Sequence, residues 1–274
     1  MFVIINIKPS GKKRVKKGRT VDKVHEFSTK DNERFYIVDV LDSAVGVNWE
    51  EVSLFLGKHR KTVLFDRRFD FPRNAPVQRF EPTEFRQLLL FNTASLIFKE
   101  LYLSGFRIKC CVNDTAAECL HLLEKIVKYS AQIVVVTNNK FRYLAETEFL
   151  YDCYGAGITV ANHAEVSEDT IILDSDNSFN YGGKGILFSS NGAGFSPLAV
   201  DGCSFLSSLC PEYIDNIDFL AAVHKFNRCG ELSEAVLSAF MYNGTPVSVG
   251  GAANRIKNHL WKKTESEKST IFYV

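Results

Sequence analysis

The chain has 274 residues with 33 Lys and Arg against 32 Asp and Glu, so its formal net charge is +1. Hydrophobic residues make up 46% and charged residues 24% of the sequence, which are fractions typical of globular proteins. This composition excludes a disordered chain, and 17 Gly with 7 Pro are too few for a collagen-like or low-complexity chain.

Residues 1–33 are predicted to form a basic hairpin or a flexible basic arm. The apolar residues of 2–9 and 20–27 favour two short strands. Six basic residues stand between these strands: Lys12, Lys13, Arg14, Lys16, Lys17 and Arg19. A run of like charges in this position is typical of an exposed loop or an interaction arm.

Apolar runs and helical patterns alternate from residue 34 to about residue 175. The predicted strands are 34–40, 62–66, 106–112, 131–137 and 158–162, and the predicted helices are 49–58, 83–103, 116–129 and 140–154. Strands separated by helices and short turns form right-handed crossovers and a parallel sheet. We therefore predict a doubly wound α/β domain with a mainly parallel sheet over 34–175.

Residues 176–274 are predicted to form an α+β extension packed on the same domain. The runs 170–176 and 185–190 are expected to be strands at an edge of the sheet, where antiparallel pairing is open to them. Helices are expected near 213–226 and 232–242, and the Gly-rich segments around them are typical of loops.

Polar residues follow several predicted strands, at the edge where open parallel sheets bind ligands. We take Asp39, Asp114, Thr137 and Asn139 as the catalytic candidates, and Asp39, Asp114 and Asp174 as the candidate metal ligands. Carboxylates that converge at this edge could hold Mg²⁺ for phosphoester chemistry. The alternative is that they are ordinary turn and helix-capping residues. No GxGxxG or GxxxxGK[ST] motif follows a predicted strand.

The stretch LYLSGFRIKCCVND, followed by AQIVVVTNNKFRYLAETEFLYDCYGAGITVAN, resembles the later half of PIN and NYN ribonuclease domains. The resemblance covers about a third of the chain. It implies that Asp39 matches the leading metal-binding aspartate of those domains and that Asp114 supplies another acid. The chain departs from the pattern after Thr137, where Asn138 and Asn139 stand in place of the expected acid. The resemblance thus implies a degenerate acidic site.

The near-neutral total charge conceals an asymmetry along the sequence. Residues 1–80 contain 17 basic and 10 acidic residues, a net of +7, which leaves −6 for the rest. Arg67 and Arg68 add to the basic run at Lys12–Arg19, and phenylalanines interleave with the later basic residues. Basic residues with aromatic neighbours can bind phosphates and stack on bases, although they can equally form a solvated surface.

These observations leave three functions open, and whether the protein is an enzyme stays undecided. The first is a polyanion-binding or regulatory protein that uses its basic N-terminal third to hold a nucleic acid or a phosphorylated ligand. The second is a divalent-metal-dependent phosphoesterase or nuclease, and the third is an interaction protein that docks an acidic partner. No run of about 20 apolar residues predicts a membrane span. Seven cysteines, an odd number, favour a reducing cytoplasm.

Overall fold

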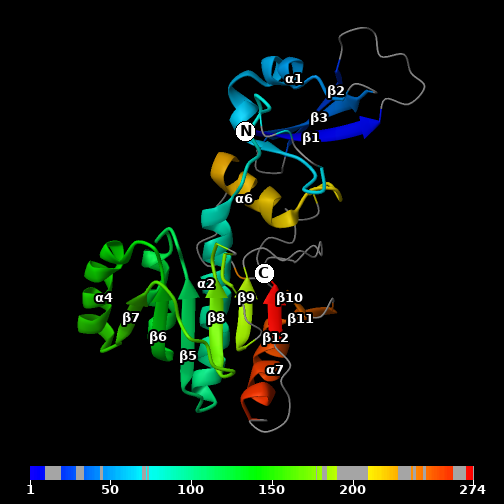
Figure 1. Ribbon diagram of the computed structural model, residues 1–274. Helices are drawn as coiled ribbons and strands as arrows, with labels where there is room; N and C mark the ends of the chain where they lie inside the picture. Colours follow the sequence, from blue (N-terminus) through cyan, green and yellow to red (C-terminus); the bar gives the residue numbers. More distant parts are fainter. Residues whose placement is uncertain are drawn as a thin grey trace. The chain divides into compact units, whose positions relative to one another are not determined.

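The computed structural model describes residues 1–9, 20–28, 34–43, 46–69, 72, 74–176, 178–180, 184–189, 209–227, 236, 239–242, 245–261 and 270–273. The chain divides into two compact units (Figure 1). Unit 1 comprises residues 1–82 and 203–232, and unit 2 comprises residues 83–202 and 233–274. These boundaries differ from the predicted divisions after residues 33 and 175.

Unit 1 contains a four-stranded sheet in the order β2-β3-β1-β4. Its strands are β1 (Phe2–Pro9), β2 (Val21–Ser28), β3 (Arg34–Asp42) and β4 (Val63–Leu64). β3 runs parallel to β1 and antiparallel to β2, and β4 is parallel to β1. The predicted hairpin is therefore wrong in its pairing, because β3 lies between β1 and β2. The basic residues from Lys12 to Arg19 lie outside the described residues.

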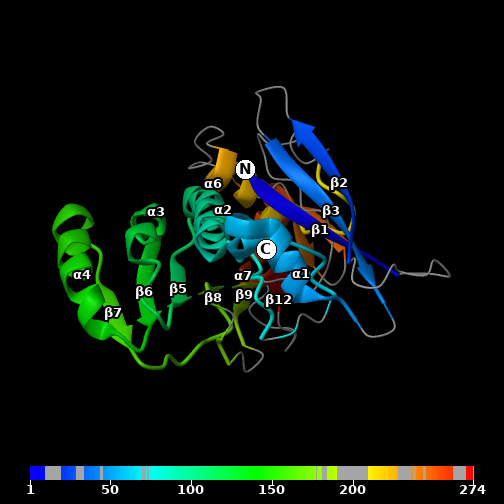
Figure 2. The ribbon, with the colours of Figure 1, turned by 90° about the horizontal axis from the view of Figure 1, so that it is seen from above.

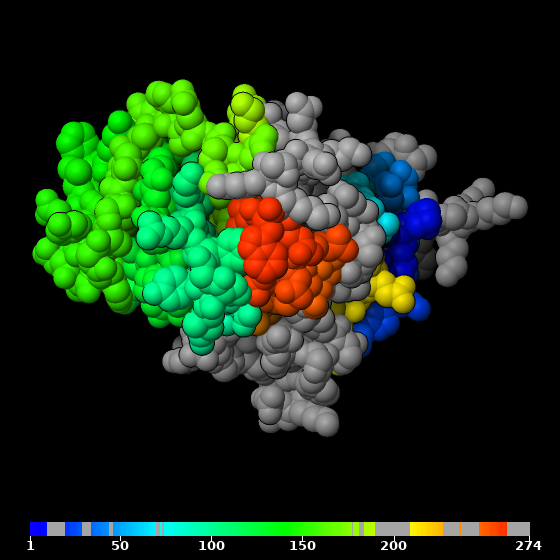
Figure 3. Space-filling model, turned by 90° about the horizontal axis from the view of Figure 1, so that it is seen from below, coloured from blue at the N-terminus to red at the C-terminus, as the bar shows by residue number. Residues whose placement is uncertain are grey.

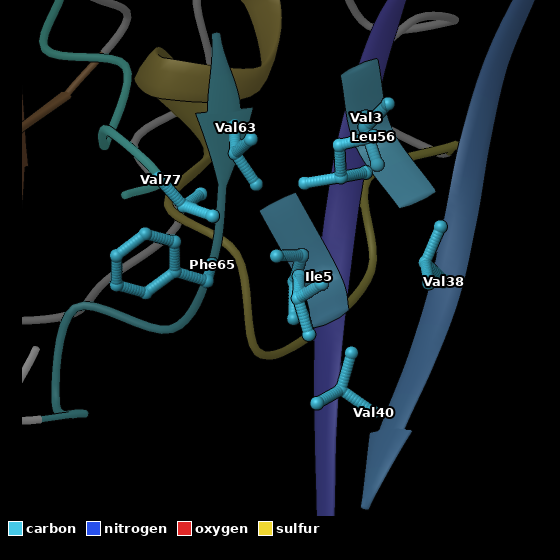
Figure 4. Packing of buried hydrophobic residues seen from close by; sticks show 9 residues of the cluster. Val3, Ile5, Val38, Val40, Leu56, Val63, Phe65 and Val77 are labelled. Atoms are coloured by element: carbon cyan, nitrogen blue, oxygen red, sulfur yellow. The ribbon is translucent and has the colours of Figure 1, made fainter. Parts of the chain in front are cut away.

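One face of this sheet packs on α1 (Trp49–Leu56) through a hydrophobic core of mainly aliphatic side chains (Figure 4). Val3 and Ile5 alternate along β1 with residues of the opposite face, as a pleated strand requires, and they meet Leu56 of the helix in this core. Asn48 caps α1 as predicted, since its side chain accepts a hydrogen bond from the amide of Glu51. A short 3₁₀ helix, η1 (Gly57–Lys61), follows directly.

The opposite face of the same sheet packs on α6 (Asn216–Asn227) through stacked aromatic rings. Phe2 and Phe35 stack at 5.4 Å, and Phe219 of α6 meets both rings edge-on. Edge-to-face geometry is favoured because the positive ring edge meets the negative ring face. The segment 203–232 thus belongs to unit 1 because its helix completes the core of that unit.

Unit 2 contains an eight-stranded sheet in the order β11-β10-β12-β9-β8-β5-β6-β7. Its strands are β5 (Ile108–Asn113), β6 (Ser130–Val136), β7 (Ile158–Ala161), β8 (Thr170–Asp174), β9 (Ile186–Ser189), β10 (Ala239–Tyr242), β11 (Thr245–Ser248) and β12 (Thr270–Tyr273). The six strands from β12 to β7 are mutually parallel. With β5 taken as the first strand, their order is 3-2-1-4-5-6, the order of the dinucleotide-binding fold.

This arrangement confirms an α/β fold with parallel strands and corrects two details. β8 is a central parallel strand between β5 and β9, where the sequence led us to expect an edge strand. β10 occupies residues 239–242 of the predicted helix 232–242, and most of the remainder of that segment lies outside the described residues. β10 pairs antiparallel with both β11 and β12.

The helices of unit 2 that the structure describes are α2 (Thr83–Leu103), α3 (Glu124–Val127), α4 (Lys140–Tyr154) and α7 (Val249–Trp261). α2 contacts both α3 and α7, and α3 contacts α4, so these helices form one layer (Figure 2). α7, orange-red in Figure 3, lies alongside α2. On the opposite face, Ala164, Val166 and Phe179 pack against a cluster around Cys111 and Ile172. The doubly wound arrangement, in which helices cover both faces of the sheet, stays a prediction.

The predicted helix 116–129 is wrong over half of its length. Only η2 (Leu120–Leu122), a 3₁₀ turn, and the four residues of α3 are helical. Ala117 adopts a positive φ of 57°, in the left-handed region that interrupts a right-handed helix. The amphipathic pattern of this segment therefore marks a buried face without a continuous helix.

Candidate functional site

The polar residues at the carboxyl ends of β5 and β8 meet around one amide group. The side-chain nitrogen of Asn113 lies 2.8 Å from Oδ1 of Asp174 and 2.7 Å from Oδ1 of Asp176. β5 and β8 are neighbours in the sheet, but the chain continues from them in opposite directions. From β5 it continues to β6 and β7 on one side, and from β8 it continues to β9 on the other side. In open α/β sheets this topological switch point is where ligands bind. Asn113, Asp174 and Asp176 therefore form the candidate site of unit 2.

The two carboxyl groups of this site differ in proton affinity. Burial raises the pKa of Asp174, and the nearby charge of Asp176 raises it further, against the hydrogen bond from Asn113. Burial also acts to raise the pKa of Asp176, but hydrogen bonds from Ser178 and Thr115 outweigh it, so that pKa lies below its usual value. Asp174 thus keeps its proton to higher pH than Asp176, as expected for two acids that face each other.

Asp114, a predicted catalytic and metal-binding residue, has its carboxylate occupied by the protein itself. Its oxygens accept hydrogen bonds from the amides of Glu118 at 3.0 Å and Cys119 at 2.8 Å, and from the hydroxyl of Tyr143. Asp114 is 1% exposed. In dinucleotide-binding folds the amides after the first strand face a pyrophosphate. Here a carboxylate of the chain takes the amides of Glu118 and Cys119.

Thr137 and Asn139, the other predicted catalytic residues of unit 2, lie at the turn between β6 and α4. The buried Thr137 hydroxyl accepts a hydrogen bond from the amide of Asn139 and lies 3.4 Å from the carbonyl oxygen of Thr115. Asn139 precedes α4, but its side chain makes no capping hydrogen bond. This geometry matches the alternative in which Thr137 is an ordinary turn residue, and the Asn139 side chain is exposed.

Asp39, the remaining catalytic candidate, lies within β3 and not after its end. Its carboxylate accepts hydrogen bonds from Asn6 at 2.8 Å and Lys8 at 2.6 Å, and both donors lie on β1. Burial would raise the pKa of Asp39, but these bonds and the charges of Lys8 and His25 hold it below its usual value. The predicted strand 34–40 is two residues too short, because β3 continues to Asp42, so Asp39 lies inside the strand and not beyond its end.

The predicted metal ligands do not all belong to one unit. Asp39 belongs to unit 1, whereas Asp114 and Asp174 belong to unit 2. Within the described residues, no group of three or more His, Cys, Asp or Glu side chains is arranged to hold a metal ion. The metal-binding role of the three residues stays a prediction.

Two of the predicted polyanion-binding residues are engaged in ion pairs of unit 1. The guanidinium group of Arg67 makes two hydrogen bonds of 2.7 Å to the carboxylate of Asp218 on α6. Arg68 pairs with Asp66, its neighbour two residues earlier, at 2.6 Å. A phosphate ligand would have to compete with both carboxylates, so these arginines are poorly suited to bind it.

A different basic cluster is available in the 3₁₀ helix that follows α1. Lys58, Arg60 and Lys61 are exposed, and none of them forms an ion pair within the described part of the chain. Burial lowers the pKa of the adjacent His59, and the positive charge of Lys58 lowers it further. The cluster is visible in the sequence as the run GKHRK, but only the structure separates it from basic residues that are already paired.

No helix within the described ranges is long and apolar enough to cross a membrane. No protein-family model matches the sequence, and no curated protein matches it. Among the solved structures that match is L-tryptophan dehydrogenase from Nostoc punctiforme, with 10% identity, 84% of this chain and 76% of that chain covered, and a TM-score of 0.34. A similarity at this TM-score is too low to support an inference about function.

Proposed function

We propose that this protein binds a polyanion, such as a nucleic acid or another phosphate-rich ligand, through the basic segments of unit 1. The observation that carries this proposal is the exposed cluster of Lys58, Arg60 and Lys61, which has no acidic partner within the described residues. Lysine and arginine side chains that neutralise phosphates release condensed counterions, and this release drives binding. A cluster already paired with carboxylates would gain much less.

The charge of the two units supports the same proposal. Unit 1 contains 19 Lys and Arg against 15 Asp and Glu, a net of +4, which leaves −3 for unit 2. The run from Lys12 to Arg19 contributes six of these basic residues to unit 1. An excess of one sign within a compact unit raises the local concentration of a ligand of the opposite sign.

The test is the binding of fluorescently labelled single-stranded DNA of about 20 nucleotides, followed by anisotropy. The variant Lys58→Ala/Arg60→Ala/Lys61→Ala removes three positive charges from the cluster. If each of them contacts a phosphate, the affinity at about 0.1 M salt falls by about two orders of magnitude. An unchanged affinity contradicts the proposal.

The matched control is Lys99→Ala/Arg107→Ala/Lys128→Ala, which removes the same charge from exposed positions of unit 2. We expect this variant to bind the DNA as the unmodified protein does. An equal loss in both variants would indicate a response to net charge alone. Retention of polyglutamate without retention of DNA would instead favour the docking of an acidic protein partner.

A second candidate function is divalent-metal-dependent phosphoester hydrolysis at the candidate site of unit 2. It is favoured by the carboxyl groups of Asp174 and Asp176, which converge on Asn113 at the switch point. Carboxylate oxygens are the ligands that Mg²⁺ prefers, and bound Mg²⁺ would polarise a phosphate ester. The test is the hydrolysis of bis-p-nitrophenyl phosphate. Hydrolysis would support this second function if it requires Mg²⁺, is lost in Asp176→Asn and persists in the control variant Glu165→Gln. No Mg²⁺-dependent hydrolysis by the unmodified protein would contradict it.

A further inference from the structure

The exposed cluster of Lys58, Arg60 and Lys61 adjoins an exposed aromatic ring. Phe55 lies in the last turn of α1, three residues before Lys58, and its side chain is 51% exposed. Three residues span at most about 11 Å even when fully extended, so one short strand of nucleic acid can reach both the ring and the first cation. The last turn of α1 and η1 therefore form one surface that carries an aromatic ring and three cations.

The ring of Phe55 has no aromatic or cationic partner within the described residues. Phe27, the other exposed phenylalanine among the described residues of unit 1, differs in this respect, because it stacks on Phe35 at 5.3 Å. A half-exposed ring without a stacking partner can act as a platform for a nucleic-acid base, since every base has a π face.

Acidic and basic residues are segregated along this segment. Glu50 and Glu51 lie in the first turn of α1, and no acidic residue occurs between Val52 and Phe65. The carboxylate of Glu51 accepts a hydrogen bond of 2.8 Å from the amide of Thr20. A strand whose phosphates contact the cluster of Lys58, Arg60 and Lys61 therefore meets no carboxylate of this segment on its way to Phe55.

The burial of α1 and the requirement for an open base indicate which ligand fits this surface. A helix that lies on a lipid surface buries a continuous apolar face in the membrane, but the apolar side of α1 packs in the core of unit 1 through Val52 and Leu56. In duplex DNA the bases are already paired and stacked, and a side chain gains access to them only by unstacking a step. A single strand offers open base faces at no such cost.

We propose that this surface holds a single-stranded nucleic acid, with one base stacked on Phe55 and the neighbouring phosphates held by the cluster of Lys58, Arg60 and Lys61. The inference rests on the polyanion binding proposed above and names its ligand. Aromatic side chains next to a positively charged surface bind single strands with little sequence preference. The bases of the strand then contribute to the affinity as well as its phosphates.

Fluorescence anisotropy with two labelled probes of about 20 nucleotides tests the inference. One probe is oligothymidylate, and the other is an abasic strand that has the same phosphates and no bases. Phe55→Ala is expected to raise the Kd for oligothymidylate at least about fivefold and to leave the Kd for the abasic strand unchanged. The matched control is Leu54→Ala, which removes an 84% exposed side chain that has no π face. This control is expected to leave both Kd values unchanged.

The outcomes separate this inference from the function on which it rests. If both probes bind equally tightly and Phe55→Ala changes neither Kd, no base stacks on the ring; the inference is then overturned and polyanion binding stands. If neither probe binds, the proposed function fails and the inference fails with it. Binding to vesicles of phosphatidylserine and phosphatidylcholine that Phe55→Ala abolishes, without binding of either probe, would assign the surface to a membrane and overturn the inference.

A tryptophan at the platform gives a direct readout of the contact. The variant Phe55→Trp also carries Trp49→Phe and Trp261→Phe, so that the introduced indole is the one tryptophan of the chain. It keeps a π face and is expected to bind oligothymidylate at least as tightly as the unmodified protein. Oligothymidylate is expected to quench the indole fluorescence, and the abasic strand is not. Equal quenching by the two probes, or quenching by neither, contradicts the stacking.

Discussion

The ion pair between Arg67 and Asp218 joins the two chain segments of unit 1, and its removal has a calculable effect. Arg67 donates two hydrogen bonds of 2.7 Å to the carboxylate, and the two side chains are 26% and 8% exposed. Breaking a fully buried pair costs about 3–5 kcal/mol. Since Arg67 keeps a quarter of its exposure and has Asp215 at 3.9 Å, we expect Asp218→Ala to lower the free energy of unfolding by about 2–3 kcal/mol.

The assay is urea unfolding followed by the fluorescence of Trp49, which packs against Phe69 in unit 1. The chain has two tryptophans, so the measurement is made with Trp261→Phe to remove the signal of unit 2. Replacing both charges, with Arg67→Met and Asp218→Leu, is expected to recover part of the loss, because no charge is then left buried without its partner. An exposed surface ion pair contributes about 0.5 kcal/mol to stability. If Asp218→Ala lowers the free energy of unfolding by less than this, the Arg67–Asp218 pair does not act as a buried ion pair and the prediction is wrong.

Three further predictions concern unit 2. Tyr143→Phe keeps the ring but removes the hydroxyl that donates to the buried carboxylate of Asp114; we expect a loss of about 1.5–3 kcal/mol in urea unfolding. The pKa of Asp174 is raised in the folded state, so its contribution to stability is present below its usual pKa of 3.8 and is lost as pH rises through the folded value. Asp174→Asn should therefore gain stability relative to the unmodified protein as the pH rises from acid to neutral, and a constant difference would contradict this. Burial raises the pKa of Cys111 to about 12, whereas Cys153 is exposed; peptide mapping after brief alkylation should find Cys153 labelled and Cys111 unlabelled until the protein unfolds.

Local sequence patterns predict the secondary structure of this chain better than its pairing. The helix 83–103 is found at the predicted residues because its apolar positions, the preceding Pro82 and the following Gly105 agree. The strands of unit 2 are parallel as their alternation with helical segments implies. The position of β3 between β1 and β2 has no local signal, because pairing across 30 residues is decided by packing on α1 and α6.

The unit boundaries and the roles of the candidate residues depend on contacts distant in sequence. The segment 203–232 joins unit 1 through Phe219, whose ring contacts Phe35 and Phe2, 184 and 217 residues earlier in the chain. The sequence pattern correctly predicts that Asp114 and Asp174 lie at strand ends, but it contains no sign that the Asp114 carboxylate caps a buried turn. Asn113 directly precedes Asp114 and Asp176 lies two residues after Asp174, yet only the neighbouring positions of β5 and β8 bring Asn113 and Asp176 together.

The central claim is that the cluster of Lys58, Arg60 and Lys61 contacts phosphates, and the salt dependence of binding measures such contacts directly. For single-stranded DNA, the logarithm of the association constant falls with the logarithm of salt concentration by about 0.7 for each phosphate neutralised. We predict that the triple alanine variant has a slope shallower than that of the unmodified protein by about 2.1. Equal slopes for the two proteins would contradict it, because they would mean that the cluster contacts no phosphate.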